Sequence, residues 1–250
     1  MTPITSPQNP RLKQLRKLAR SRERERTGLF VAEGEDLVIA AQAAGRSPVF
    51  GFYAPGAEPA TAGLGAVAGI PGFEEIAPEL LAEVSTLGSG TRAIGVYERE
   101  MGVFKAPLCV YLYAIKDPGN VGTVLRSALA FGAGVALGPG CADPHSPKAV
   151  RASMGAIFSV PIGRVASIDE LPGERVALVA HVGEPLASLK TNGPVTLLVG
   201  AEREGLPQDV IDACEHVAHI PIVSESLNAA MAATVALYEM TTQTARVPSS

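Results

Sequence analysis

Short apolar runs alternate with amphipathic segments along the second half of the chain. The apolar runs have the length and composition of buried strands and span residues 108–115, 135–137, 160–162, 176–180, 195–199 and 217–222. Between the first two runs, residues Val121, Val124, Leu125, Ala128 and Phe131 follow the spacing of one helix face. This alternation predicts an α/β domain in which helices cover both faces of a parallel sheet.

Two further helices are predicted in this half from their starting residues. Ser146-Pro147 precedes a helix over residues 148–157, because proline is favoured at the first helical position. Ser226 is the predicted N-cap of a final helix. The apolar residues of that helix fall at positions 227, 230, 231, 234, 235 and 238, which predicts that this face is buried.

The first half predicts a smaller, mixed α/β domain. A basic helix is expected over residues 9–26, with Leu12, Leu15 and Leu18 as its apolar stripe. Three strands (residues 29–34, 49–53 and 93–97) and two helices (36–44 and 78–84) follow, while the Gly- and Pro-rich residues 54–72 include loops. We therefore predict a first domain over residues 1–98, a linker over 99–107 and a second domain over 108–250.

Composition and cysteine usage exclude several classes of protein. With 250 residues, 47% hydrophobic and 18% charged, the chain has an ordinary globular composition. Neither a membrane-spanning run nor a signal peptide is recognisable, so we expect a cytoplasmic protein. Cys109, Cys141 and Cys214 are isolated, and His216 and His219 lack further ligands nearby. No disulfide framework and no metal site is expected.

The charge is unevenly distributed. The formal net charge is −4, yet eight of the 21 Lys and Arg residues lie between Arg11 and Arg26. A cationic segment on an acidic protein is typical of phosphate contact, but a solvated helix with a ladder of charge pairs gives the same pattern. The segment alone leaves both interpretations open.

Three segments of the second half carry candidate chemistry. Asp117-Pro-Gly-Asn120 follows the first strand and leads into a helix that carries Arg126, at the end of a strand where ligands bind in α/β sheets. A turn with Asn120 as N-cap would explain this segment equally well. Gly200 ends another strand, and without a side chain its backbone is open to a ligand. Together with Ile220 and the start of the last helix, these backbone groups could hold a small adenine-bearing molecule.

Taken together, these segments resemble a known family. Residues 117–132 resemble the first motif of the SpoU (TrmH-type) RNA 2′-O-ribose methyltransferases, a branch of the SPOUT superfamily. Residues 200–205 are similar to their second motif, 226–228 to their third, and 148–155 to a segment between the first two. The first half resembles the ribosomal-protein-like substrate-binding domain of the rRNA-modifying members, notably at Asn9-Pro10 and residues 30–34.

The resemblance implies a fold, a cofactor and a partner. The fold would be a parallel sheet with a deep C-terminal trefoil knot, which physical rules alone would not propose. The knot would hold S-adenosylmethionine, with Gly200, Ile220 and Leu227 contacting the adenosine through backbone groups. The family works as homodimers and transfers a methyl group to a ribose 2′-hydroxyl of structured RNA. Large-subunit (23S) rRNA is the expected substrate.

The resemblance also implies roles for single residues. Arg126 would meet the 2′-hydroxyl and its 3′-phosphate, and Asn120 would position the loop around it. Glu202 and Asn228 would orient Arg126 and the methionine end of the cofactor, with support from Ser226. Because a guanidinium stays protonated, we favour a phosphate clamp over a general base for Arg126. The expected RNA-binding residues are Arg11, Lys13, Arg16, Lys17, Arg22 and Arg92.

An α/β chain is also compatible with other functions. A nucleotide-dependent dehydrogenase and a Rossmann-type methyltransferase both require a Gly-x-Gly-x-x-Gly turn after the first strand, where this chain has Asp117-Pro-Gly-Asn120. A catalytically silent RNA-binding or ribosome-assembly protein and a tRNA 2′-O-methyltransferase remain as alternatives. Binding of S-adenosylmethionine distinguishes an enzyme from a silent relative.

Overall fold

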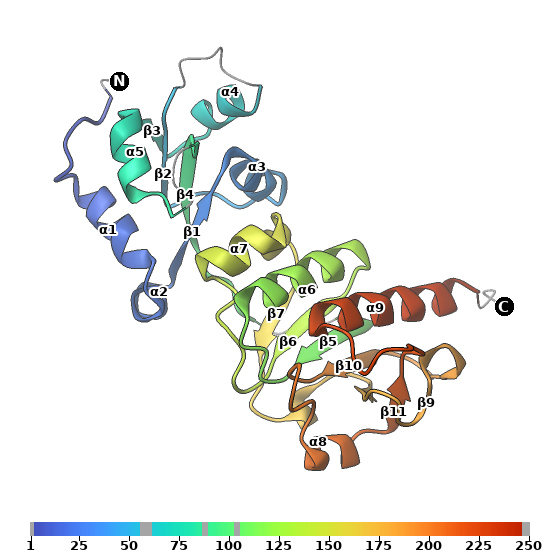
Figure 1. Ribbon diagram of the computed structural model, residues 1–250. Coiled ribbons are helices and arrows are strands. Elements are labelled where there is room, and N and C mark those ends of the chain that lie inside the picture. Colours follow the sequence, from blue (N-terminus) through green and yellow to red (C-terminus); the bar gives the residue numbers. More distant parts are fainter. Residues whose placement is uncertain (1–2, 56–61, 87–89, 103–105, 247–250) are drawn as a thin grey trace. The chain divides into compact units, whose positions relative to one another are not determined.

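The chain forms two compact units that do not coincide with its two halves. The computed structural model describes residues 3–55, 62–86, 90–102 and 106–246 (Figure 1). One unit comprises Met1–Arg99 together with Asp143–Phe158, and the other comprises Glu100–Ala142 and Ser159–Ser250.

The first unit contains a mixed four-stranded sheet with the order β1-β4-β2-β3. Its strands are β1 (Leu29–Glu33), β2 (Phe50–Tyr53), β3 (Phe73–Glu75) and β4 (Ala93–Glu98). β4 runs antiparallel to β1 and β2, whereas β2 and β3 are parallel. The three predicted strands are confirmed. The short β3 was missed.

Helices lie on both sides of this sheet (Figure 1). They are α1 (Pro10–Leu18), α2 (Ser21–Thr27), α3 (Glu35–Ala43), α4 (Ala62–Ala68), α5 (Pro78–Val84) and α7 (Pro147–Ser153). The predicted helices at 36–44 and 78–84 are confirmed. α4 was missed because a segment of glycines and alanines shows no clear period, although Val67 and Ile70 pack with Val38 and Phe73.

The prediction of one basic helix over residues 9–26 is wrong, since α1 and α2 are separate helices. Arg20 has an extended backbone (φ −91°, ψ 133°) between them. The Arg24 guanidinium, on α2, donates to the carbonyl oxygens of Leu18 and Ala19, both at 2.9 Å. These are terminal carbonyls of α1 that no further helical turn would satisfy, so Arg24 stabilises the break. The leucine stripe at 12, 15 and 18 is buried, as predicted.

Residues 143–158 were assigned to the second domain but pack within the first unit. The helix predicted over 148–157 ends at Ser153, because Met154 (φ 49°) and Gly155 (φ 91°) are left-handed, and a 3₁₀ turn, η1 (Ala156–Phe158), follows. The Phe158 ring lies 5.7 Å from that of Phe30 and 4.9 Å from that of Tyr97. This segment therefore completes the aromatic core of the first unit.

The second unit contains a seven-stranded sheet in which every pair of neighbours is parallel, as predicted. The order is β7-β6-β5-β10-β8-β11-β9. The strands are β5 (Leu108–Leu112), β6 (Gly134–Leu137), β7 (Ile162–Arg164), β8 (Glu174–Leu178), β9 (Glu184–Pro185), β10 (Val195–Val199) and β11 (His216–His219). β5 and β10 pair in register, so both end at the same edge of the sheet.

Helices cover both faces of this sheet, which confirms the α/β prediction. α6 (Pro118–Ala130) and α9 (Ala229–Arg246) lie on one face, and α8 (Gln208–Asp212) lies on the other (Figure 1). The 3₁₀ turns η2 (Ile168–Glu170) and η3 (Leu186–Ser188) complete the unit. Within the described residues, no helix is both long and apolar enough to cross a membrane.

The last helix differs from its prediction in its start and in its buried face. Asn228, not Ser226, caps α9, because its Oδ1 accepts from the backbone N–H groups of Ala230 (2.9 Å) and Met231 (3.3 Å). The buried residues are Ala229, Ala230, Ala233, Ala236, Leu237 and Met240. Met231, Val235 and Tyr238, predicted to be buried, are 61%, 41% and 56% exposed.

Candidate functional site

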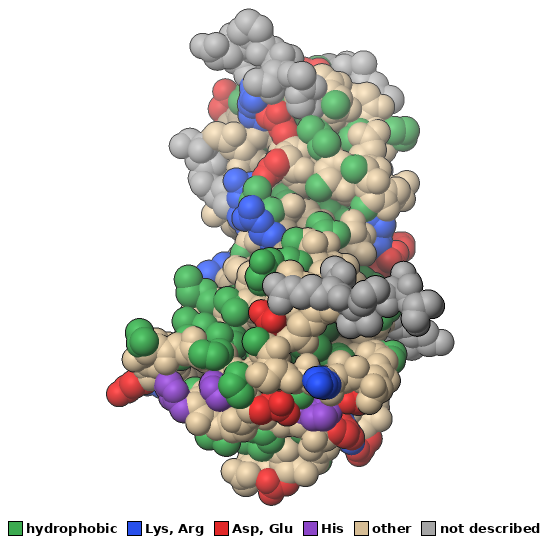
Figure 2. Space-filling view, turned by 90° about the vertical axis from the view of Figure 1, so that its right-hand side faces the viewer, with side chains coloured by type: hydrophobic (Ala, Val, Ile, Leu, Met, Phe, Trp, Pro, Cys, Tyr) green, Lys and Arg blue, Asp and Glu red, His purple; other side chains and the backbone are tan. Residues whose placement is uncertain are grey.

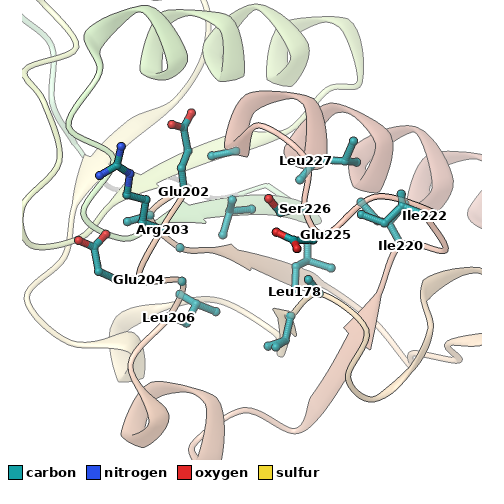
Figure 3. A pocket seen from close by; sticks show the side chains of 18 of the residues that line it. Leu178, Glu202, Arg203, Glu204, Leu206, Ile220, Ile222, Glu225, Ser226 and Leu227 are labelled. Atoms are coloured by element: carbon teal, nitrogen blue, oxygen red, sulfur yellow. The ribbon is translucent and has the colours of Figure 1, made fainter.

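A cavity of about 510 Å³ lies where three parallel strands end (Figure 3). Its walls come from residues 178–180 after β8, 199–206 after β10 and 220–227 after β11. The carboxyl edge of a parallel sheet is the usual ligand site of such folds. A cavity of this volume accommodates a nucleoside-sized molecule.

Gly200, Ile220 and Leu227, the predicted cofactor-binding residues, all line this cavity. Ser226 and Glu202 line it as well. Sequence reasoning missed the apolar residues Leu178, Leu206 and Ile222 and the carboxylate Glu225, which also line the cavity (Figure 3). Leu178 was missed because it is the last residue of β8 but lies inside the strand that was predicted over 176–180.

Gly200 is a glycine for a different reason than expected. A Cβ atom at this position would lie 2.2 Å from the carbonyl carbon of Gly205 and 2.4 Å from the amide nitrogen of Leu206. The segment from Ala201 to Gly205 folds back on itself, with the Gly205 N–H donating to the Ala201 carbonyl at 2.9 Å. The absence of a side chain thus allows this turn to close.

A polar network joins three segments beside the cavity. Glu202 Oε1 accepts hydrogen bonds from Asn120 Nδ2 and Asn228 Nδ2, both at 2.7 Å. Asn228 Nδ2 also lies 3.2 Å from Asn120 Oδ1. Asp117, rather than Asn120, caps α6 by accepting from the Gly119 N–H at 2.9 Å. The Asn120 side chain therefore takes part in the network and does not serve as the N-cap.

Arg126 lies apart from this network. Its side chain is exposed on α6 and forms no hydrogen bond or ion pair with any residue that the structure describes. Asn120 and Arg126 are six residues apart, which puts them about 120° apart around the helix axis. The expected contact between Glu202 and Arg126 is not present, since the Glu202 carboxylate bonds to the two asparagines.

Two histidines lie against backbone carbonyl oxygens of neighbouring segments. His181 Nε2 lies 3.1 Å from the Ser224 carbonyl oxygen, and His219 Nδ1 lies 3.2 Å from that of Gly183. His216 Nε2 meets the Glu174 carboxylate at 2.8 Å. Across the described part of the chain, no three His, Cys, Asp or Glu side chains form a group that could hold a metal ion.

The cysteines are not placed for thiolate chemistry. Burial raises the pKa of the Cys109, Cys141 and Cys214 thiols, that of Cys214 to about 11. All three are therefore protonated at neutral pH and are poor nucleophiles.

The basic residues of the first unit fall into two groups. Arg11 pairs with Glu74, Arg16 with Glu83 at 3.2 Å, and Arg92 with Glu35 at 2.8 Å. Lys13, Lys17 and Arg22 are exposed and form no ion pair with the described residues. The run of positive charge is thus partly neutralised.

One member of that run is structural. Arg24 is only 3% exposed and pairs with Asp143 at 2.8 Å. Its partner lies on the returning segment 143–158, so this ion pair joins distant parts of the first unit.

Comparison with known proteins gives one family match in each half of the chain. Residues 107–238 match the model of the SpoU rRNA methylase family, and residues 9–94 match that of the MRM3-like substrate binding domain. A tRNA/rRNA methyltransferase of uncharacterised function from Synechocystis is 31% identical, with 94% of this chain and 92% of the relative covered.

Two further relatives carry a named activity or a bound cofactor. The 23S rRNA (guanosine-2′-O)-methyltransferase RlmP of Bacillus subtilis is 28% identical, with 96% of this chain and 99% of RlmP covered. The crystal structure of AviRb from Streptomyces viridochromogenes in complex with AdoMet (S-adenosylmethionine) superposes with a TM-score of 0.83 at 29% identity. That superposition covers 96% of this chain and 99% of AviRb.

Proposed function

Because the chain belongs to the SpoU rRNA methylase family, it is an S-adenosylmethionine-dependent rRNA 2′-O-methyltransferase, and we propose that its substrate is a ribose of 23S rRNA. The observation that carries this proposal is the cavity at the ends of β8, β10 and β11, bordered by the network of Asn120, Glu202 and Asn228. RlmP, which matches along nearly its whole length, supports the choice of rRNA. The same relatives support a cytoplasmic location.

The cavity fits the cofactor in size and in the character of its walls. Backbone groups of Gly200, Ile220 and Leu227 would face the adenosine, where fixed N–H and C=O groups suit a neutral adenine edge. Leu178 and Ile222 offer apolar surface for the ring. When bound, S-adenosylmethionine supplies an electrophilic methyl group on a positively charged sulfur.

The surrounding side chains would position the RNA. We assign Arg126 to the ribose 2′-hydroxyl and its 3′-phosphate, as a bidentate clamp that also stabilises the oxygen as it gains negative charge. Its exposure and lack of a partner among the described residues leave the guanidinium available for this contact. Asn120, Glu202 and Asn228 hold the ends of three segments together, and Ser226 borders the cofactor.

A deep trefoil knot is part of the proposal. The chain leaves β11, next to the edge of the sheet, and returns to its middle, where α9 packs against β10 and β5. This return passes through residues 220–227, which line the cavity opposite the turn over 199–206. An experimental structure in which these two segments do not interlock would contradict the knot.

We further propose that two copies of the chain associate through α6 and α9. Met231, Val235 and Tyr238 form an exposed stripe on α9, next to Leu129 of α6, which is 48% exposed. The Phe131 ring lies 6.3 Å from that of Tyr238 and extends the stripe. Hydrophobic side chains are gathered at the left of the lower part of Figure 2. Contiguous exposed apolar surface of this kind is typical of protein interfaces.

Two measurements test the proposed function. Calorimetry with S-adenosylmethionine should show binding to the purified protein, and the absence of binding would leave a silent RNA-binding protein as the better interpretation. Mapping of 2′-O-methyl groups in rRNA from cells with and without the gene should show the loss of one site in 23S rRNA. An unchanged map of 23S rRNA, with a change in tRNA, would overturn the choice of substrate.

A further inference from the structure

A small groove between α1 and α2 has no role in the cofactor site. Its volume is about 150 Å³, and its lining includes Lys13, Gln14, Lys17, Glu23, Arg26 and Thr27. Lys13 and Lys17 are one helical turn apart on α1, so both ammonium groups border the same opening. Three cations and one carboxylate leave the lining with a net positive charge.

Two of the three cations of this groove are unpaired within the described residues. Lys13 and Lys17 form no ion pair with any described residue. Arg26 donates to Glu23 at 2.8 Å, but its side chain is 64% exposed, and such a pair contributes little in water. Arg11 and Arg16, on the same helix as the lysines, are paired instead with Glu74 and Glu83.

The neighbouring side chains also fit an anion. Gln14 adds a polar group to the lining, and Arg26, which directs Nε and Nη2 at one oxygen of Glu23, retains Nη1 for a phosphate oxygen. No aromatic side chain lines the groove, so it has no surface on which a base could stack. These features suit the RNA backbone and carry no information on sequence.

We propose that this groove is a binding site for phosphates of the substrate RNA, and that Lys13, Lys17 and Arg26 hold those phosphates. The proposal rests on the proposed function and narrows it, since it assigns the contact to one concave part of the first unit. Arg11 and Arg16 do not line the groove and contribute little to this contact. The groove positions the RNA, and recognition of the target nucleotide takes place elsewhere.

The test compares two double variants with the same loss of charge. The probe is a fluorescein-labelled oligouridylate, because the proposed contact does not depend on sequence. Binding is followed by fluorescence anisotropy at several salt concentrations. K13Q/K17Q should bind about tenfold more weakly near physiological salt, and the slope of log K against log [salt] should fall by roughly 1.4, about 0.7 for each lost phosphate contact. K13R/K17R should bind like the wild type.

R11Q/R16Q is the matched control, since it removes two positive charges from the same helix. We expect its affinity within about twofold of the wild type and its salt slope unchanged. Equal losses of affinity in K13Q/K17Q and R11Q/R16Q, or wild-type binding by K13Q/K17Q, would show that the groove is not the phosphate-binding site. Thermal unfolding midpoints should confirm that every variant is folded.

Measurement of cofactor binding separates the test of the groove from the test of the proposed function. S-adenosylmethionine should bind all variants equally in calorimetry, because the groove and the cavity belong to different units. If the wild type binds the oligouridylate through the lysines but does not bind the cofactor, the methyltransferase function is contradicted and the phosphate-binding site is supported. Cofactor binding without any effect of K13Q/K17Q on RNA would give the opposite result.

Discussion

In the proposed function, the chemistry of the site depends on Arg126. Arg126→Lys keeps the positive charge but loses the two-pronged geometry that matches a phosphate or a developing oxyanion. We expect turnover to fall at least about a hundredfold, comparable to the loss of one oxyanion donor, with little change in cofactor affinity. Single-turnover methylation and calorimetry measure the two quantities. Wild-type rates for Arg126→Lys across the pH range would contradict the clamp.

Single residues of the site could be predicted where they depend on position along the chain. Gly200 and Ile220 follow strand ends, Leu227 lies just before α9, and all three line the cavity as expected. Contacts between side chains could not be predicted in the same way. Glu202 pairs with Asn120 and not with Arg126 because these two side chains leave α6 in different directions. Which of them meets Glu202 is decided by helix geometry together with the position of the 199–206 turn.

At the scale of elements, the positively charged run from Arg11 to Arg26 shows that a local sequence pattern does not reveal contacts with distant residues. Its leucines correctly identify a buried helix face. The break between α1 and α2 is stabilised by Arg24, whose partner Asp143 lies 119 residues later in the chain. Charge patterns within one segment contain no information about such a partner, so a buried arginine was indistinguishable from its solvated neighbours.

Removal of Arg24 should therefore destabilise the first unit. Arg24→Met leaves the carbonyls at the end of α1 without a donor and Asp143 with one of its cations missing. We expect a loss of about 3–5 kcal/mol in the free energy of unfolding, as for other broken buried pairs. Arg22→Met, at an exposed position two residues earlier, should change it by less than about 0.5 kcal/mol. Urea denaturation followed by tyrosine fluorescence compares the two, and equal effects would contradict a structural role for Arg24.

The same cluster should make the first unit sensitive to acid. Burial lowers the pKa of His145, and Arg99 lies against its ring with Nε 3.3 Å from Nδ1. The folded state therefore binds a proton less readily than the unfolded state, and stability should be lost as pH falls below about 6.5. Burial would raise the pKa of Asp143, but hydrogen bonds from His145 and Arg24 outweigh it and hold the pKa well below its usual range. That contribution is lost only at lower pH, from about 4 downward.

His145→Gln tests this order of events. The variant removes the group that titrates first, so the decline in thermal midpoint between about pH 6.5 and 5 should become shallower, while the decline below about pH 4 should remain. Parallel curves for the variant and the wild type over the upper range would show that His145 does not control it.

The final helix, α9, shows that an apolar pattern does not always identify the buried side of a helix. α9 has apolar residues on more than one side, and a helix of that kind has no polar face to indicate which side packs. Its alanines at 229, 230, 233 and 236 allow close approach to the sheet, and the larger Met231, Val235 and Tyr238 are left outside. The period of 3.6 residues correctly predicted a helix, but it could not decide which side is buried.

At the scale of the whole molecule, this outer stripe makes the oligomeric state testable. Val235→Glu places a charge in the middle of the stripe without touching the buried alanines. Sedimentation should give a dimer for the wild type and a monomer for this variant, because an unpaired carboxylate is strongly disfavoured in an apolar interface. Ile39→Glu, at a similarly exposed apolar position of α3 in the first unit, is the control and should remain dimeric. A monomeric wild type would rule out the proposed association.

The two units are not separated at a single point of the chain. The chain first passes from one unit to the other between Arg99 and Glu100, while a linker over residues 99–107 stays a prediction, since residues 103–105 lie outside the described residues. The return of residues 143–158 was not predictable, since Ser146-Pro147 and its helix look like one more repeat of the strand and helix alternation. Its contacts with distant residues distinguish it, namely those of Phe158 with Phe30 and Tyr97 and the ion pair of Asp143 with Arg24.

That excursion has a consequence for the order of events during synthesis. As the polypeptide emerges from the ribosome, the first unit cannot close around Phe30 and Tyr97 until Phe158 has been translated. Residues 100–142, which include β5, α6 and β6, appear in the meantime. At roughly 5–20 residues per second, the nascent aromatic surface waits for several seconds without its covering segment. This interval is where a chaperone would be expected to act.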